Sequence, residues 1–191
     1  MLLIGPDIVS FLDTLASLRV DIFREYPYLY KGNTDNELSY LRIYTTSPEA
    51  VLITVNHAES LAGAVTAIPL KDEMEELTAP FAGSDYPVDK IFYIGELLFY
   101  PSYRNKGLGT QLLETVERHV RSTGNYTHLT CATVVRPYDH PQRPEAYVHI
   151  DHFLHRNRFV PLPTVTTSIV WQELDGISRD HTMQFWIKEL S

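Results

Sequence analysis

Cysteine is nearly absent from this 191-residue sequence, and long apolar runs are missing altogether. Cys131 is the only cysteine, so no disulfide can form within the chain, and its apolar neighbours indicate a buried strand residue rather than a nucleophile. A membrane-spanning helix needs about 20 consecutive apolar residues, and the best run, 91–100, is far shorter. The first residues lack the basic region of a secretory signal. We therefore expect a soluble, cytoplasmic protein without a membrane partner.

Positive charge is also scarce, with 16 Lys and Arg against 24 Asp and Glu and a formal net charge of −8. Affinity for nucleic acid depends largely on basic side chains that neutralise phosphates, so this balance disfavours a nucleic-acid partner. An acidic surface weakly favours a cationic or amine ligand. The hydrophobic content of 44% and charged content of 21% are those of ordinary globular proteins. The length suits one domain over residues 1–191.

Helix and strand patterns follow one another along the chain without an internal repeat. Apolar spacings of three and four predict an opening helix from Pro6 to Ile22, and a second helix, capped by Asp35, that ends before Ser47. The stretch 71–89 is typical of a surface excursion. Further helices are expected at 108–120 and 150–156, and strands at 51–55, 61–70, 91–100, 127–135, 164–172 and 182–188. This order predicts a mixed α/β fold.

A glycine-containing loop follows the strand 91–100 and opens the next helix. Such a loop brings free backbone N–H groups and the positive end of a helix dipole to one point, which predicts a phosphate site. Gly107 and Gly109 let the backbone approach an anion closely, while Arg104 and Lys106 add positive charge. A P-loop would need Lys and then Ser or Thr after its last glycine, and a dinucleotide fingerprint would need Gly or Ala where Leu112 stands. Neither fits.

The loop and the strand before it resemble the signature of the GNAT superfamily of N-acetyltransferases. That signature is Arg/Gln-x-x-Gly-x-Gly/Ala after a strand of the form apolar-x-apolar-x-Pro-x-x-Arg, and residues 97–109 match it throughout. The order of the expected elements is also that of the superfamily. The resemblance implies a central, mostly antiparallel sheet, flanked by helices, which splays where the strand 127–135 leaves the strand 91–100. The stretches 23–30, 136–141 and 183–186 further resemble a largely uncharacterised bacterial branch.

The resemblance implies acetyl-CoA as the donor substrate. Leu98, Phe99 and Tyr100 would offer backbone groups to the acyl and pantetheine arm. The loop would surround the pyrophosphate. Its implied residues are Arg104, Asn105, Lys106, Gly107, Leu108, Gly109 and Thr110.

Acetyl transfer to an amine needs a base for the amine proton and an acid for the leaving thiolate. Glu96, a carboxylate on an otherwise apolar strand, is the candidate base, and an ion pair within the sheet is the alternative. His140, held between prolines in the loop 136–144, is a second candidate, as base or as acceptor ligand. The superfamily's usual acid is a tyrosine in a Tyr-x-x-x-Gly-Phe-like motif. Leu154 and Arg158 stand at its tyrosine and glycine positions, so the customary acid is missing.

Water or another side chain would then protonate the thiolate, the candidates being Tyr138, His140, Tyr147, His152 and His155. The expected acceptor contacts are Tyr28, Tyr30 and Tyr138. Three histidines at 149, 152 and 155 invite a metal hypothesis. Because each step of three turns a helix by about 300°, they do not share one face, and we expect no metal site.

The sequence thus predicts an acetyl-CoA-dependent N-acetyltransferase that acts on a primary amine of a small molecule or a protein, by direct transfer in a ternary complex. The missing tyrosine keeps one alternative open, a catalytically silent acyl-CoA-binding or regulatory module. A homodimer is compatible with the resemblance, since many relatives pair.

Overall fold

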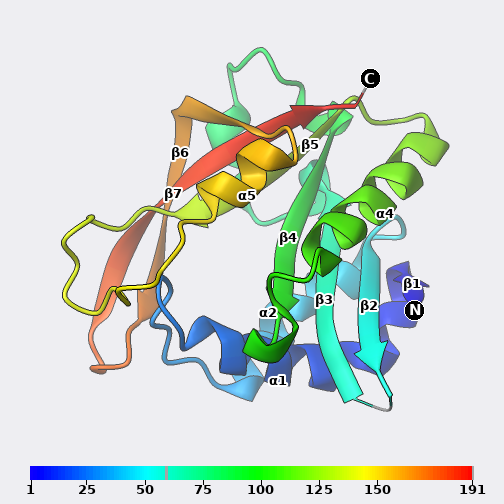
Figure 1. The fold of residues 1–191 in the computed structure, drawn as a ribbon. Helices are drawn as coiled ribbons and strands as arrows, with labels where there is room; N and C mark the ends of the chain where they lie inside the picture. Colours follow the sequence, from blue (N-terminus) through cyan, green and yellow to red (C-terminus); the bar gives the residue numbers. More distant parts are fainter. Residues whose placement is uncertain (59, 191) are drawn as a thin grey trace.

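The computed structural model describes residues 1–58 and 60–190, and a seven-stranded sheet runs through it (Figure 1). β4 and β5 are parallel, and all the other neighbouring strands are antiparallel. This arrangement confirms the predicted mixed α/β fold with a mostly antiparallel sheet. In spatial order the strands are β1 (Leu2–Ile4), β2 (Val51–His57), β3 (Ser60–Pro69), β4 (Ile91–Phe99), β5 (His128–Val134), β7 (Ser178–Glu189) and β6 (Val160–Gln172).

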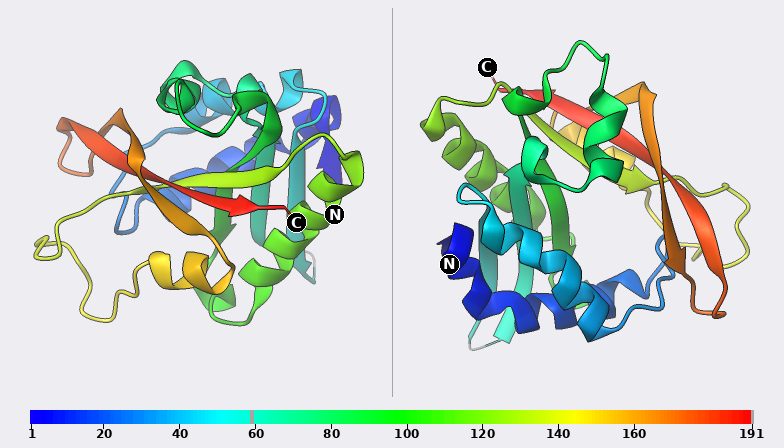
Figure 2. Two further views of the ribbon diagram at one scale, coloured as in Figure 1. Left: turned by 90° about the horizontal axis from the view of Figure 1, so that it is seen from above. Right: turned by 180° about the vertical axis from the view of Figure 1, so that it is seen from behind.

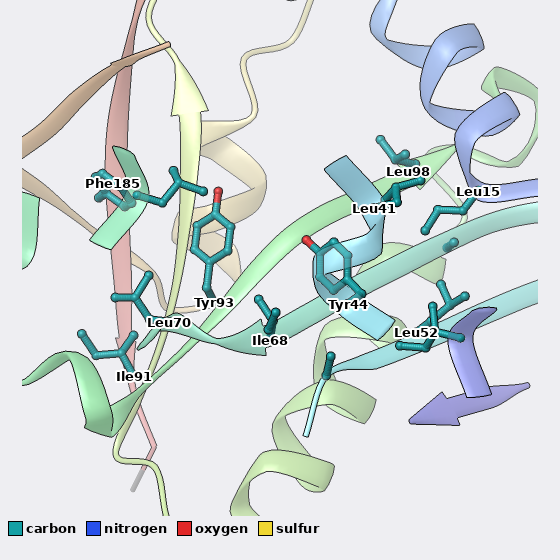
Figure 3. Close-up of a cluster of buried hydrophobic side chains, with 14 of the residues drawn as sticks. Leu15, Leu41, Tyr44, Leu52, Ile68, Leu70, Ile91, Tyr93, Leu98 and Phe185 are labelled. Atoms are coloured by element: carbon teal, nitrogen blue, oxygen red, sulfur yellow. The ribbon is translucent and has the colours of Figure 1, made fainter. Parts of the chain in front are cut away.

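Helices cover both faces of the sheet (Figure 2). On one face lie α1 (Leu12–Phe23), α2 (Thr34–Thr46) and the short α3 (Glu75–Thr78), and on the other lie α4 (Leu108–Thr123) and α5 (Asp151–Arg156). Each face buries its own apolar cluster, as the period-two alternation of strands requires. The cluster under α1 and α2 is shown in Figure 3 and includes Leu15, Leu41, Tyr44, Leu52, Ile68, Tyr93 and Leu98. The cluster under α4 includes Val65, Phe92, Leu112, Leu113, Val116, Val120 and Trp186.

The pairing between β4 and β5 is short. It covers only three residue pairs, from Ile91 opposite His128 to Tyr93 opposite Thr130. β4 then continues to Phe99 and β5 to Val134 as the two strands separate. The predicted splay between these strands is therefore confirmed, and it divides the sheet into β1 to β4 on one side and β5 to β7 on the other.

The opening helix and the cap of the second helix differ from the prediction. Gly5–Phe11 is a 3-10 helix, and the α-helix begins only at Leu12. Apolar residues three apart fit a 3-10 helix as well as an α-helix, so the spacing alone could not separate the two. Asn33, not Asp35, caps α2, because its Oδ1 accepts a hydrogen bond of 2.9 Å from the backbone N–H of Asn36. Asp35 lies in the first turn, where its charge suits the helix dipole.

The segment 71–89 is more than a surface excursion, since Leu77 and Phe81 are buried. The ring of Phe81 meets that of Phe185 edge to face, with centroids 5.0 Å apart.

β6 begins at Val160, four residues before the expected start at 164. An edge strand tolerates proline, so Pro161 does not delay it. No helix of the described residues has the length and apolarity that crossing a membrane requires.

Candidate functional site

A cavity of about 610 Å³ opens where β4 and β5 separate. The residues of these strands that line it, 94–99 and 131–134, all lie beyond the last paired residues of the two strands. The end of α1 with the segment after it, the glycine loop with the start of α4, and residues 147–159 complete its lining. The splay of the sheet therefore creates the cavity, and the flanking helices and loops enclose it.

The glycine loop forms part of the lining of this cavity. Its backbone enters the left-handed region at Asn105, with φ 59°, and again at Gly107, with φ 78°. Gly107 is the N-cap of α4 and makes no side-chain capping bond, so the first N–H groups of this 16-residue helix are left for another acceptor. Free N–H groups together with the positive end of a helix dipole are an arrangement that suits an anion.

Arg104 fixes the position of the loop. Its Nε donates a hydrogen bond of 2.9 Å to the backbone oxygen of Phe99, at the end of β4. Its guanidinium also forms an ion pair of 2.6 Å with Glu25, in the segment that follows α1. Gly109, in the first turn of α4, allows α5 to pack close by, since a Cβ there would lie 3.2 Å from the ring of Phe153. These contacts join the loop to β4, α1 and α5.

Glu96 lies on the part of β4 that lines the cavity, and it is only 3% exposed. A β-bulge sets its orientation. Thr66 pairs with Glu96 and Ala67 with Ile94, so Gly95 is an extra residue in β4. Because one extra residue reverses the alternation of side chains, Glu96 points to the face of α1 and α2, whereas Ile94 belongs to the cluster under α4.

On that face the Glu96 carboxylate meets a buried arginine. It accepts hydrogen bonds from the guanidinium of Arg19 and from the hydroxyl of Thr66, and Arg19 also forms an ion pair with Glu37. The guanidinium carbon Cζ of Arg19 lies 4.6 Å from the ring centroid of Tyr40. One guanidinium thus serves two buried carboxylates. The group Arg19, Glu37 and Glu96, here called the arginine cluster, sets two carboxyl groups against one guanidinium beside the cavity, a formal charge of −1.

The model of the acetyltransferase (GNAT) family matches residues 15–143. The chain belongs to the GNAT family. It is accordingly an acyltransferase, and the family match and the structure confirm the resemblance seen in the sequence.

Solved structures of the same fold cover nearly the whole chain. An aminoglycoside 6'-N-acetyltransferase complexed with coenzyme A is 17% identical, with a TM-score of 0.56 over 93% of this chain and 92% of that one. A ribosomal-protein-alanine N-acetyltransferase from Brucella melitensis is 16% identical, with a TM-score of 0.59 over 100% and 99%. A Salmonella typhimurium protein with its cofactor acetyl-CoA is 11% identical, with a TM-score of 0.58 over 100% and 94%. Curated protein sequences gave no match.

Most of the residues that the GNAT resemblance assigns to the donor lie together in the cavity lining. Tyr100 and Lys106 stand apart from the cavity lining. The hydroxyl of Tyr100 donates a hydrogen bond of 3.2 Å to Asp21, and the ammonium of Lys106 lies 5.6 Å from the ring centroid of Tyr103. The expected donor residues that do line the cavity are Leu98, Phe99, Arg104, Asn105, Gly107, Leu108, Gly109 and Thr110.

The expected acceptor contacts are dispersed. Tyr28 lines the cavity, and burial raises the pKa of its hydroxyl to about 12. Tyr30 lies outside the lining and forms an isolated β-bridge with Glu173. Tyr138 is 84% exposed and packs against the guanidinium of Arg143. His140 is not part of the cavity lining, and its ring centroid lies 5.6 Å from that of Tyr26, which is.

Two aromatic residues and one cysteine at the cavity were not assigned to the acceptor from the sequence. Tyr26 and Tyr147 line the cavity and meet edge to face, with centroids 4.7 Å apart. The aromatic run 26–30 was a visible signal, but it does not tell which rings face inward. Cys131 also lines the cavity, and burial raises the pKa of its thiol to about 12, so it is a neutral thiol at pH 7. Among the residues described, no group of three His, Cys, Asp or Glu side chains could hold a metal ion.

Replacing Arg19 by Met is expected to lower the free energy of unfolding by about 3–5 kcal/mol, because it leaves two buried carboxylates without their cation. Equilibrium urea unfolding measures the loss. Arg24→Met is the matched control, since it removes an exposed guanidinium at the end of the same helix. Equal losses in the two variants would show that the arginine cluster contributes nothing particular to stability.

Proposed function

We propose that this chain is an acetyl-CoA-dependent N-acetyltransferase that passes the acetyl group directly to a primary amine in a ternary complex. The observation that carries the proposal is one continuous cavity. It has an uncapped helix N-terminus with a glycine loop at one end, and a carboxylate and aromatic rings elsewhere in its lining. Donor and acceptor can therefore meet in one space. The solved relatives whose names include coenzyme A or acetyl-CoA support the donor.

The donor end suits a long, anionic thioester. The N–H groups of residues 107–110 would hold its pyrophosphate, with Arg104 keeping the loop in place. Beyond Tyr93, β4 has no strand partner on the side of β5 among the described residues, so its backbone groups there can bind the amide-containing arm. Leu97, Leu98 and Phe99 line this part of the cavity.

The acceptor enters as an ammonium and must lose a proton before it can attack. The excess negative charge of the arginine cluster favours a cation in the cavity. Glu96 takes the proton, directly or through a water molecule, while Arg19 and Thr66 hold its carboxylate. His140 supports the acceptor side through its contact with Tyr26. Acetyl-CoA supplies the activated acetyl group. As the new amide bond forms and the C–S bond breaks, the nitrogen loses its second proton, which a water molecule passes to the leaving thiolate.

Gly107→Ala is expected to weaken acetyl-CoA binding by at least about tenfold, or 1.4 kcal/mol. The added methyl group would occupy space at the loop where no protein atom lies within 4 Å, and which the pyrophosphate needs for a close approach to the backbone. Isothermal titration calorimetry measures the dissociation constant. Gly83→Ala is a matched control, because Gly83 has a similar φ of 80° and equally open surroundings but lies outside the cavity lining. Both variants carry a similar strain, so an equal effect on binding would contradict the loop assignment.

Glu96→Gln is expected to lower turnover by about a hundredfold or more, as the loss of a general base does, with acetyl-CoA affinity nearly unchanged. Release of CoA in the presence of an amine measures turnover. Glu37→Gln removes the other carboxylate from Arg19 but lies outside the cavity lining. At a saturating amine concentration it should therefore keep most of the turnover, while the loss of the excess charge raises KM for the amine. Unchanged turnover in Glu96→Gln, or equal loss in both variants, would remove the proton-accepting role from Glu96.

A further inference from the structure

Aromatic rings gather in the cavity wall formed by the segment after α1 and the segment before α5. The centroids of Phe23 and Tyr28 are 4.5 Å apart, and those of Tyr26 and Tyr147 are 4.7 Å apart at an interplanar angle of 89°. All four rings line the same cavity. In Figure 1 their two segments, in blue and yellow, lie toward the β6–β7 side, whereas α4 lies on the opposite side of β4. Glu25, between Phe23 and Tyr26, forms an ion pair with Arg104, so this wall adjoins the glycine loop.

The carboxylates in the cavity are paired with arginines, and Arg156 adds a further cation to the lining. Among the described residues that line it, the carboxylates are Glu25 and Glu96. Glu25 forms an ion pair with Arg104, and Glu96 forms one with Arg19. The single excess negative charge of the arginine cluster can attract one ammonium group. A polyamine or a polycationic sugar would bring further ammonium groups against rings, guanidiniums and imidazoles, which lowers its affinity.

The aromatic wall is also tied in place from outside. Arg136, at the end of β5, donates hydrogen bonds of 2.7 Å to the backbone oxygen of Pro27 and 3.0 Å to that of Tyr28. Its guanidinium forms a buried ion pair of 2.6 Å with Glu173, in the turn after β6. The indole N–H of Trp171 donates a further bond of 3.0 Å to the oxygen of Tyr28.

These contacts join three distant segments into one wall. A polypeptide acceptor needs an open groove on this side, and making one would break the buried Arg136–Glu173 pair, which is costly. A small acceptor needs no such change. Burial raises the pKa of the Tyr28 and Tyr147 hydroxyls to about 12 each, so both rings are neutral at pH 7 and can pack against an apolar group.

We propose that the acceptor is a small primary monoamine whose amine is joined by a short chain to an aromatic ring. Its ring packs among Phe23, Tyr26, Tyr28 and Tyr147, and its ammonium group faces Glu96. This inference rests on the proposed acetyl transfer and adds the class of acceptor to it.

The test compares four acceptors at equal acetyl-CoA: 2-phenylethylamine, n-hexylamine, spermidine and an alanine-terminated hexapeptide. Release of CoA gives kcat/KM for each. We expect 2-phenylethylamine to exceed n-hexylamine by about tenfold, since aromatic pairs add to area burial by up to about 1.5 kcal/mol. Spermidine and the peptide should be slower still.

Two variants of Tyr147 test whether the aromatic ring of the acceptor packs against this side chain. Tyr147→Ala should raise KM for 2-phenylethylamine by about tenfold, with acetyl-CoA affinity unchanged, and Tyr147→Phe should retain the wild-type KM. Tyr86→Ala removes a half-buried ring that meets His128 edge to face, outside the cavity lining, and controls for a loss of stability. It should leave KM unchanged.

The outcomes separate the two proposals. Preference for spermidine, for the peptide or for n-hexylamine over the aromatic amine overturns the acceptor class and leaves acetyl transfer standing. An unchanged KM in Tyr147→Ala does the same. Failure of every amine to release CoA overturns acetyl transfer and the acceptor class together.

Discussion

The short parallel pairing between β4 and β5 is the constraint on which the rest of the structure depends. If the two strands stayed paired beyond Tyr93 and Thr130, their hydrogen bonds would close the sheet and there would be no cavity. Because they separate, the edge of β4 and the side chains of β5 from Cys131 onward face a common space. The glycine loop, which follows β4 directly, then stands at one end of this space with the N-terminus of α4. The cavity and the place of the glycine loop in its lining are thus consequences of one separation.

A second constraint is the extra residue in β4. Gly95 shifts the register against β3, and the shift turns Glu96 from the face of α4 to the face of α1 and α2. A side chain at position 95 would collide with the hydroxyl of Tyr44, since a Cβ there would lie 1.9 Å from that oxygen. The bulge thereby places a carboxylate at the cavity while giving it a buried cation, Arg19. A charge in this position is tolerable because its partner arrives from a different element.

The sequence was informative where a function is encoded locally. The strand, proline and glycine loop are contiguous, so their pattern was enough to predict the family, which the family match confirms. The partners of Glu96 could not be predicted, because Arg19 and Glu37 come from two helices and meet only through packing. Asn33 and Asp35 are both good caps, and only the backbone conformation distinguishes them. The acceptor side was the least predictable. Tyr138 and Tyr147 belong to one irregular segment without periodicity, and the structure exposes the first and places the second at the cavity.

We propose that the chain holds acetyl-CoA in the space between β4 and β5, against the start of α4. Hydrogen exchange with and without acetyl-CoA tests this claim most directly, because slowed exchange reports amide groups that have gained a partner or lost access to water. The account predicts slower exchange over residues 94–99 and 105–110, and no change over 75–85 on the opposite face. Saturating acetyl-CoA that leaves the exchange of 105–110 unchanged would contradict it.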